Sequence, residues 1–352
     1  MKIFYTITKS EAGGAQTHVF QLSKYMKEKG HTVAIMSFPG GELEKLAKEN
    51  NITFHPNIYF KNSFNPILGL KAMKRIAEVV DVFKPDIVSC HSSIAGFWTR
   101  LVIKNKIPTI FTAHGWGFTD GVPKAKKIVV SLAERIAGKY CKKIICVSEY
   151  DRQLALKNNI VPREKLITIH NGVELFQREK TDNSINIVFV GRLSEQKDPE
   201  LLVEAFSELK EENTNLLIIG GGEKEERLKK TKRDNVLITG SLTRAETLNK
   251  LKNADIFVLT SNYEGFPITI LEAMSFGLPV IASDVGGVSE IVDNSVGYLI
   301  KRGDKEGLKR ALKELIDSKA IRLEKGNNAR KRIEESFTLD KMLSKTEQVY
   351  LQ

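Results

Sequence analysis

Short, β-branched apolar runs alternate with helical patterns along the whole chain. In the first half these runs cover 2–7, 32–38, 52–58, 86–91, 108–114, 142–148 and 165–170, with helical segments such as 15–29, 66–83 and 124–140 between them. In the second half they cover 185–191, 216–220, 236–240, 255–260 and 279–283. Alternation of this kind is typical of βαβ units and parallel sheets. The sequence therefore predicts an α/β fold of two Rossmann-like, doubly wound domains.

Two domains are also expected from length, because 352 residues exceed what one hydrophobic core usually holds. A polar stretch, 174–184, has no apolar run of any length and separates the two series of strands. We therefore predict an N-terminal domain over 1–175, a C-terminal domain over 176–337 and a last helix over 338–352. Ligands of doubly wound domains bind at the carboxyl ends of the strands, so a cleft is expected there.

The positive charge is concentrated in one half of the chain. Residues 1–180 contain 28 Lys and Arg against 15 Asp and Glu, a net +13, whereas the remainder contains 26 against 28, a net −2. A basic patch favours anionic partners, such as nucleic acid, acidic lipid or a phosphate-bearing acceptor. The alternative is a lysine-rich surface that only contacts solvent.

No apolar run approaches the ~20 residues of a membrane span. The run 3–7 is a strand, too short and wrongly flanked for a signal peptide. Three cysteines, Cys90, Cys141 and Cys146, lack metal-binding spacing and lie in apolar contexts. Reduced thiols in a cytoplasmic protein are the simplest explanation.

Two glutamates lie close together in the stretch 261–274, which follows a buried strand. Glu264 lies in the loop, and Glu272 lies in the helix that is expected to start at Pro267. Glu272 is five residues past Pro267, which is roughly 7.5 Å along the helix axis. Two carboxylates at this separation can hold two parts of one extended ligand. The helix N-terminus between them favours a phosphate. The alternative is a capping glutamate and a surface glutamate.

Other strand ends carry groups suited to phosphate. Gly13 and Gly14 follow the first strand, and Gly221 lies in the turn after the run 216–220. Glycines at strand-to-helix turns let backbone N–H groups approach phosphate closely. Arg192 and Lys197 follow the first strand of the second domain, where two cations can neutralise a diphosphate. Each glycine turn can equally be only a turn, and each cation only a solvated side chain.

Histidine and metal-binding patterns are sparse. His114 ends a strand and precedes a glycine, a suitable place for a ligand-binding group. The sequence context of His91 indicates a structural role. His18, His31 and His55 lie in no pattern that indicates a function. The chain has no Asp-x-Asp and no Cys/His cluster at metal-ligand spacing. We therefore expect no metal and no cofactor.

The combined motifs resemble those of the family 4 glycosyltransferases, which have the two-domain GT-B fold. The resemblance rests on Glu264, seven residues, then Glu272, with Gly-Phe-Pro after the first glutamate. It also rests on the Gly-Gly loop, His114-Gly, Asn171-Gly and Gly-Arg-Leu with Lys197, all in family order. Pro267 stands where many members have glycine, and Glu223 where proline is frequent. Neither departure removes a functional group.

The resemblance implies a retaining, metal-independent enzyme that moves a sugar from a nucleoside diphosphate, UDP above all. The acceptor would be a glycan or lipid-diphosphate-linked glycan of a surface polysaccharide. It also implies that the last helix crosses back to the first domain. His114, Arg192, Lys197 and Glu264 would be catalytic, by positioning the sugar or holding the diphosphate. The substrate-binding residues would be Gly13, Gly14, Asn171, Gly221, Leu242, Gly265, Phe266, Pro267, Ile268 and Glu272, with Glu272 on the ribose.

Two basic segments of the first domain remain. They are 60–75, which mixes aromatic residues with cations, and a lysine set, Lys124, Lys126, Lys127, Lys142 and Lys143. Amphipathic helices with lysines on one face often lie at a membrane surface. We therefore expect peripheral binding to the inner, anionic face of the membrane. The alternative is a core-packed helix with a solvated face.

Two other functions remain open on the sequence. One is a UDP-sugar epimerase or hydrolase of the same fold, which would need further acid–base residues and no acceptor site. The other is a nucleic-acid-binding protein, prompted by the isoelectric point of 9.3. The chain has no recognised nucleic-acid module, so we expect no nucleic-acid partner.

Overall fold

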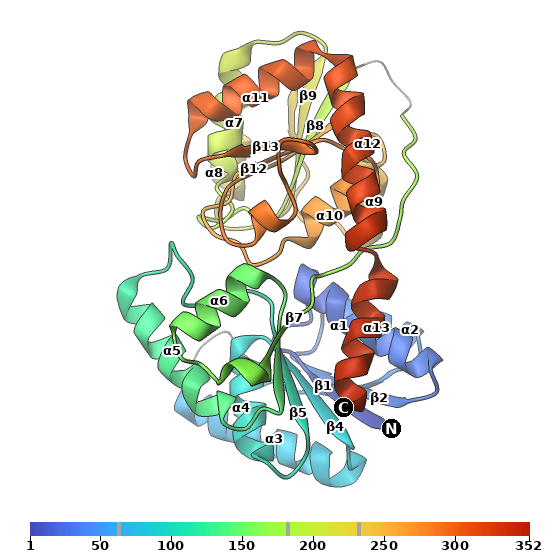
Figure 1. Cartoon of the computed structure of the whole chain (residues 1–352), viewed down its shortest axis with the longest axis vertical. Coiled ribbons are helices and arrows are strands. Elements are labelled where there is room, and N and C mark those ends of the chain that lie inside the picture. The colour runs from blue at the N-terminus through green and yellow to red at the C-terminus, as the bar shows by residue number, and fades with distance from the viewer. Residues whose placement is uncertain (62–64, 181–183, 231–233) are drawn as a thin grey trace. The chain divides into compact units, whose positions relative to one another are not determined.

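The computed structural model describes residues 1–61, 65–180, 184–230 and 234–352 (Figure 1). Residues 62–64 of the predicted basic segment 60–75, and 181–183 of the polar stretch 174–184, lie outside the described residues. The chain divides into two compact units. Unit 1 contains Met1–Asn171 and Met342–Gln352, and unit 2 contains Gly172–Lys341. The first change of unit thus falls at 171/172, a few residues before the predicted 175/176.

Unit 1 is built on a parallel sheet of seven strands in the order β3-β2-β1-β4-β5-β6-β7. The order reverses between β1 and β4, as in a doubly wound fold. Every predicted strand is present, most of them shorter by one or two residues because the ends lie in loops. The strands are β1 Lys2–Thr6, β2 Thr32–Ser37, β3 Thr53–Pro56, β4 Ile87–His91, β5 Thr109–Ala113, β6 Lys143–Cys146 and β7 Leu166–Thr168.

Helices connect these strands, as parallel pairing requires. The predicted helix at 66–83 is found with the same limits, because Asn65 caps it by accepting from the N–H groups of Ile67 and Leu68, and Pro66 suits its first turn. The helices of unit 1 are α1 Gly14–Glu28, α2 Glu42–Glu49, α3 Pro66–Phe83, α4 Ser93–Ile103, α5 Lys124–Gly138, α6 Glu149–Lys157 and the 3₁₀ turn η1 Arg163–Lys165.

Unit 2 repeats the plan with a parallel sheet of six strands in the order β10-β9-β8-β11-β12-β13. Its strands are β8 Ile185–Val190, β9 Thr214–Ile219, β10 Val236–Ile238, β11 Ile256–Leu259, β12 Val280–Ser283 and β13 Gly297–Ile300. Its helices are α7 Pro199–Leu209, α8 Glu225–Lys230, α9 Arg244–Leu251, α10 Ile268–Ser275, η2 Val288–Glu290, α11 Lys305–Asp317 and α12 Lys319–Ser336. The predicted fold class, two doubly wound α/β domains, is confirmed.

Two details of unit 2 differ from the sequence interpretation. The edge strand β13 was not predicted, because it is only four residues long and begins with glycine. A Cβ at Gly297 would lie 1.8 Å from the carbonyl oxygen of Val280, so close pairing with β12 explains the glycine. Pro267, predicted as the first helical residue, instead forms the N-cap of α10, with an extended backbone.

The last helix, α13 Leu339–Leu351, begins in unit 2 and ends in unit 1. Its unit 1 part is anchored by Tyr350, whose hydroxyl lies 2.6 Å from Oγ of Ser89 in β4, and by Glu347, which accepts a 2.6 Å hydrogen bond from Tyr25 in α1. The prediction that this helix returns to the first domain is therefore confirmed. Among the described residues, no helix is long and apolar enough to cross a membrane.

Unit 1 contains an ion pair inside its core. Arg100 of α4 and Glu134 of α5 are 0% and 1% exposed, and their side chains are 2.7 Å apart. Arg100 also donates from Nε to the Gly96 carbonyl at 2.8 Å and lies 4.0 Å from the centre of the Phe111 ring. A buried charge is tolerated only when it is paired and hydrogen-bonded, so this pair fixes how α4 and α5 pack.

Replacing Glu134 by Ala is expected to destabilise unit 1 by about 3–5 kcal/mol, because it leaves the Arg100 guanidinium buried without its carboxylate. Urea denaturation of the full chain, followed by circular dichroism, measures this loss. The matched control is Glu78→Ala, which removes the exposed Arg75–Glu78 pair and should change stability by less than about 1 kcal/mol. Equal effects of the two changes would contradict the structural role of the buried pair.

Candidate functional site

The candidate site of unit 2 lies where the order of its strands reverses. β8 and β11 are neighbours in the sheet, and the loops after them lead in opposite directions to α7 and α10. Ligands of doubly wound domains bind at this switch point, outside the carboxyl ends of the strands. Arg192 and Lys197 lie in the loop after β8, and Glu264 lies in the loop after β11. The fold therefore brings two sequence-distant candidates to one edge of one sheet.

Hydrogen bonds hold these two loops against each other. The Asn262 backbone N–H donates to the Gln196 carbonyl at 2.7 Å, and Gln196 Nε2 donates back to the Tyr263 carbonyl at 3.1 Å. Thr260 Oγ1 donates to the Asp198 carbonyl at 2.7 Å. Because both backbones take part, the side chains that the loops carry are fixed relative to one another.

Lys197 and Glu264 meet directly. Lys197 Nζ forms an ion pair with Oε1 of Glu264, and Ser261 Oγ donates to the same oxygen at 2.5 Å. Glu264 is 7% exposed, and no described residue donates to its other oxygen, Oε2. Arg192 is exposed, and none of the described residues pairs with its guanidinium. The site thus offers an open carboxylate oxygen and an open cation.

Glu272 is buried on α10 and pairs with a residue that the sequence interpretation missed. Arg244, the first residue of α9, donates from Nε to Oε1 of Glu272 at 3.1 Å. Burial raises the pKa of the Glu272 carboxyl, an effect that the charge of Arg244 opposes. No described residue donates to Oε2 of Glu272. A side chain that is 5% exposed therefore keeps one carboxylate oxygen for a hydrogen-bond donor.

The N-terminus of α10 carries Gly265, Phe266, Pro267 and Ile268. This turn is pinned by a hydrogen bond from the Gly287 N–H to the Gly265 carbonyl, 2.9 Å long. Gly286 has φ +58°, and a Cβ there would lie 1.9 Å from the Glu264 carbonyl oxygen. Only glycine permits this backbone approach, so Gly286 helps to set the position of Glu264. The N–H groups of Ile268 and Thr269, the first two of α10, have no carbonyl one turn earlier in the helix to pair with, whereas the Ile270 N–H donates to the Pro267 carbonyl at 3.2 Å.

The remaining predicted residues of unit 2 lie in the loops after β9 and β10. The Gly221 carbonyl accepts from the Leu193 N–H at 2.9 Å, which joins the β9 loop to the β8 loop. Gly220 and Gly240 form an isolated bridge between the β9 and β10 loops. Leu242 is half-buried just before Thr243, which caps α9. These loops extend the same carboxyl edge of the sheet.

Unit 1 carries a second candidate site, built from three histidines. His114, which follows β5, is half-buried, and its Nε2 lies 3.0 Å from Nδ1 of His91 at the end of β4. His91 Nε2 lies 3.0 Å from Ser89 Oγ, which in turn contacts Tyr350. The His18 ring, on α1, lies edge-on to His114 with 4.8 Å between centroids. The sequence had indicated a structural role for His91 and given no signal for His18.

Asn171 joins this histidine cluster, because its Oδ1 accepts from His18 Nδ1 at 3.2 Å. Burial lowers the pKa of His18 to about 4 and holds the pKa values of His91 and His114 well below their usual range. All three rings are therefore neutral at neutral pH. The predicted loop of Gly13 and Gly14 begins α1, one turn before His18, with Gly13 as the N-cap.

The structure thus divides the predicted residues between two sites. Within unit 2 it brings together Lys197 and Glu264 and places Glu272 on the following helix. Within unit 1 it places His114 and Asn171 each against His18. Arg244 and His18 were missed because neither lies at a strand end or in a motif, and only tertiary packing places them there.

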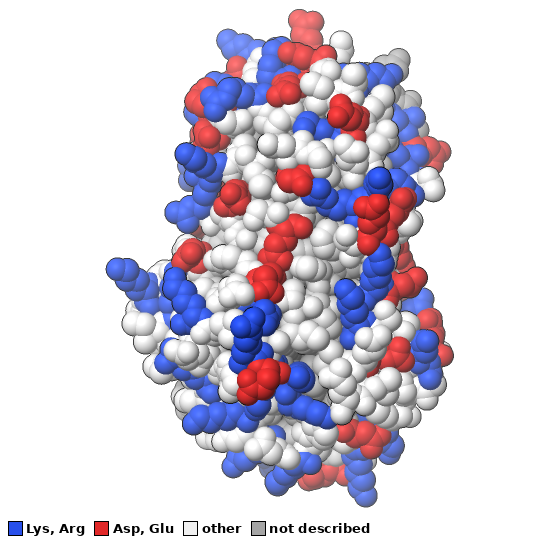
Figure 2. Space-filling model, in the orientation of Figure 1, with Lys and Arg blue, Asp and Glu red and all other residues white. Residues whose placement is uncertain are grey.

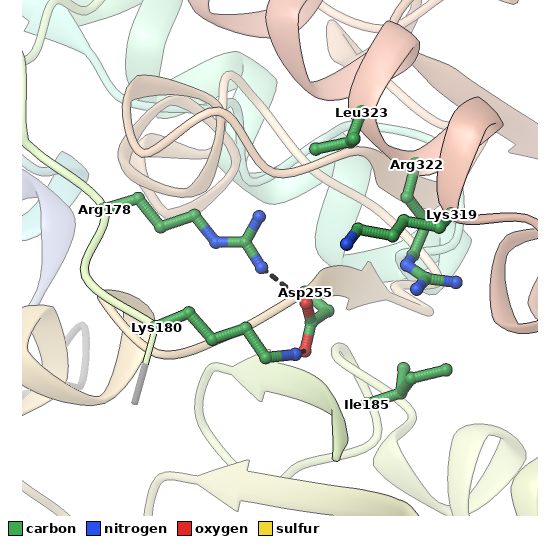
Figure 3. A pocket seen from close by; sticks show the side chains of 7 residues that line it. All are labelled: Arg178, Lys180, Ile185, Asp255, Lys319, Arg322 and Leu323. Carbon is green, nitrogen blue, oxygen red and sulfur yellow. Dashed lines mark hydrogen bonds and ion pairs between the residues drawn. The ribbon is translucent and has the colours of Figure 1, made fainter. Parts of the chain in front are cut away.

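A separate basic cavity of about 370 Å³ lies in unit 2 (Figure 3). It is at the opposite edge of the sheet, near the start of β8 and β11. Asp255 there pairs with Arg178 and Lys180, both at 2.5 Å. The cavity contains none of the predicted site residues; its lining is Arg178, Lys180, Ile185, Asp255, Lys319, Arg322 and Leu323.

Replacing Arg244 by Gln is expected to destabilise the protein in a pH-dependent way. Because the pKa of the Glu272 carboxyl is raised in the folded state, the folded protein holds the carboxyl proton more tightly than the unfolded chain does. The free energy of unfolding therefore falls as pH rises through the folded-state pKa. Removing Arg244 raises that pKa further and extends the fall to higher pH. The variant should therefore lose about 1–3 kcal/mol at pH 7 and less at pH 5, measured by urea denaturation.

The control for this experiment is Arg302→Gln, an exposed arginine of the same unit. The loss of unfolding free energy in this control should be small and equal at pH 5 and pH 7. A deficit of Arg244→Gln that does not change between pH 5 and pH 7 would argue against the coupling of Arg244 to the Glu272 carboxylate.

Comparison with known proteins agrees with this geometry. Residues 12–176 match the model of Glycosyltransferase Family 4, and residues 173–332 match that of Glycosyl transferases group 1. A UDP-Gal:alpha-D-GlcNAc-diphosphoundecaprenol alpha-1,3-galactosyltransferase from Escherichia coli is 31% identical over 310 residues, 81% of this chain and 80% of that protein. The capsular polysaccharide biosynthesis glycosyltransferase CapM of Staphylococcus aureus is 25% identical, covering 99% of this chain and 96% of that protein.

Solved structures share the fold. Anabaena HepE, solved in complex with UDP and glucose, superposes with a TM-score of 0.86 over 100% of both chains at 18% identity. Sucrose-phosphate synthase from Thermosynechococcus elongatus gives 0.86 over 100% of this chain and 98% of that one, at 19% identity. Together with the match to the E. coli galactosyltransferase, the family models show that this chain is a glycosyltransferase and belongs to family 4.

Proposed function

We propose that this glycosyltransferase moves a sugar from a UDP-sugar to a lipid-diphosphate-linked glycan, with retention of the anomeric configuration and without a metal ion. The product would serve the synthesis of a bacterial surface polysaccharide. Its similarity to a relative named for UDP-Gal and a GlcNAc-diphosphoundecaprenol acceptor supports both the donor and the acceptor class. The observation that carries the proposal is the open oxygen that both buried glutamates, Glu264 and Glu272, retain.

Glu272 is assigned to the ribose of the donor. A buried carboxylate needs hydrogen-bond donors, and Arg244 supplies them to only one of its oxygens. The two hydroxyls of a ribose are donors of the right kind for the other. Gly221 and Leu242, in the neighbouring loops, would border the nucleotide.

Glu264 is assigned to the hydroxyls of the transferred sugar, and Arg192 and Lys197 to the diphosphate. The exposed Arg192 guanidinium and the Lys197 ammonium lie in one loop, and Lys197 pairs with Glu264 in the loop before α10. Cations and helix N–H groups stabilise the negative charge that develops on a departing phosphate. The chain therefore carries a substitute for the divalent metal that other glycosyltransferases use.

The proposed transfer is a same-face displacement. The acceptor hydroxyl attacks the anomeric carbon from the side on which UDP leaves, and the bond from that carbon to the phosphate oxygen breaks. The proton of the acceptor passes to an oxygen of the departing β-phosphate, so that no protein base is required. His114 would position the sugar through a ring that is neutral at neutral pH.

We also propose that unit 1 binds an anionic membrane. Helix α5 exposes an apolar stripe, Ile128, Val129, Leu132 and Ile136, each 49–60% exposed. Lys124, Lys126 and Lys127 lie in the first turn of the same helix. Figure 2 shows Lys and Arg side chains along the lower and left margins of unit 1. An apolar stripe flanked by lysines is the pattern of a helix that lies in the plane of a bilayer surface.

Replacing Glu272 by Ala is expected to abolish the thermal shift that UDP gives the wild-type protein, because the ribose loses its carboxylate. A ligand that binds only the folded state at a hundredfold excess over its Kd stabilises it by about 2.7 kcal/mol, a shift of several degrees in Tm. The control, Glu324→Ala, changes an exposed glutamate of α12 and should keep the full shift.

An undiminished thermal shift in Glu272→Ala would contradict the assignment of Glu272 to the ribose.

The wild-type protein also tests whether transfer requires a metal ion. Transfer should proceed unchanged in EDTA, whereas loss of transfer in EDTA and recovery with Mn²⁺ would overturn the metal-free mechanism. Product formed from the UDP-sugar without any acceptor would favour an epimerase or hydrolase.

The double change Ile128→Asp with Leu132→Asp is expected to weaken binding to vesicles of acidic lipid at least tenfold. Two apolar side chains leave the lipid and two negative charges face an anionic surface. Co-sedimentation with phosphatidylglycerol vesicles measures the bound fraction. Leu237→Asp, at an exposed leucine of unit 2, is the control and should bind as the wild type does. If the wild type stays in the supernatant, the docking proposal is wrong.

A further inference from the structure

Three imidazoles converge in unit 1 although the sequence contains no metal-binding spacing. One ring nitrogen from each of His18, His91 and His114 lies within 4.8 Å of one from each of the others. They come from α1, from the end of β4 and from the loop after β5, so only the doubly wound topology brings them together. His18 and His91 are 2% and 0% exposed, and His114 is half-buried, which leaves a route from solvent.

Hydrogen bonds outside the cluster orient two of the rings. Asn171 Oδ1 can only accept, so His18 Nδ1 carries the proton and its Nε2 is a lone pair. That Nε2 is buried, and no described residue contacts it with a donor. Ser89 Oγ occupies the outer nitrogen of His91, which leaves Nδ1 directed towards His114. Polar groups on the outer nitrogens are the arrangement that orients metal-ligating histidines in proteins.

From this geometry we infer that His18, His91 and His114 form a binding site for a divalent transition-metal ion, with Zn²⁺ as the best fit. Three neutral imidazoles and one open position are a common zinc environment. With metal–nitrogen distances of 2.0–2.1 Å, two ligands of a tetrahedral ion lie about 3.4 Å apart. His91 Nδ1 and His114 Nε2 are joined by a 3.0 Å hydrogen bond, so a bound ion would displace the proton between them and the two nitrogens would move slightly apart. His18 completes the set with a ring nitrogen that lies within 4.8 Å of the other two ligand atoms.

This site shares His114 with the transfer chemistry proposed above, although that chemistry itself uses no metal. A bound ion takes Nε2 of His114 and so fixes the ring that we assign to the sugar. The inference itself does not depend on the proposed function, because metal binding is measured with neither donor nor acceptor present.

The experiment titrates the chelator-treated full chain with Co²⁺ and records the visible absorption of the bound ion. One equivalent per chain is expected, with a spectrum typical of nitrogen ligands in four- or five-coordinate geometry, and Zn²⁺ should displace it. His18→Phe, which keeps a ring of similar size, should weaken binding at least tenfold. Asn171→Ala, which removes only the orienting group, should weaken it about tenfold. His31→Ala, in the same unit, is the control and should bind as the wild type does.

Absence of the spectrum in the wild type would overturn the inference. So would equal affinity in His18→Phe and the wild type, since Co²⁺ would then be held elsewhere on the surface. Because Asn171→Ala leaves all three rings in place, it provides a second test should His18→Phe fail to fold. Unchanged affinity in Asn171→Ala would mean that the orientation of His18 plays no part in binding.

Discussion

Parallel pairing is the constraint on which both units depend. Consecutive parallel strands need a crossover connection, so the chain must leave each strand at its carboxyl end and return over a face of the sheet. All such exits lie on one edge, and the order of strands reverses once in each sheet, between β1 and β4 and between β8 and β11. At these two points the loops after neighbouring strands lead in opposite directions, and polar side chains lie between them. Thr8 and Ser92, which meet at 2.6 Å after β1 and β4, are one example.

Much of this arrangement is predictable because it is local. The limits of α3 follow from Asn65 and Pro66, and the strands follow from short apolar runs. Candidate residues at strand ends are predictable for the same reason. The carboxyl ends of parallel strands all lie at one edge of the sheet, so the end of a strand in the sequence also gives the location of the residue in the fold. Lys197 and Glu264 were each named from the sequence in this way, and the sheet order then brings them together.

The unpredicted residues depend on packing between elements. Arg244 is an ordinary N-terminal residue of a helix until α9 packs near α10 and Glu272. His18 lies on a helix face whose pattern shows only that it is buried. Nothing in the spacing of 18, 91 and 114 indicates contact, because the separations are set by the lengths of intervening helices. A single sequence therefore predicts which edge holds the site, but not every side chain that reaches it.

Buried charges in this protein differ in how completely they are satisfied. Asp255 uses both of its oxygens, accepting from Arg178 at one, and from Lys180 and the Asn186 N–H at the other. Glu264 and Glu272 each accept through Oε1 alone. A structural carboxylate gains most when every lone pair has a donor, whereas a binding carboxylate must keep one free. This difference separates the two glutamates from Asp255, although Glu134, buried against Arg100, also accepts through one oxygen.

The two units handle polarity at their candidate sites in opposite ways. Unit 2 keeps charged groups, and each glutamate has a cation beside it that limits the cost of desolvation. Unit 1 uses neutral imidazoles, whose burial lowers their pKa values and removes the charge instead. Charged groups suit a diphosphate, which brings its own charge. Neutral rings suit a hydroxyl or a metal ion, since protonated imidazoles would repel the ion and lose their ability to accept hydrogen bonds. Burial thus favours the neutral form of all three rings in this part of unit 1.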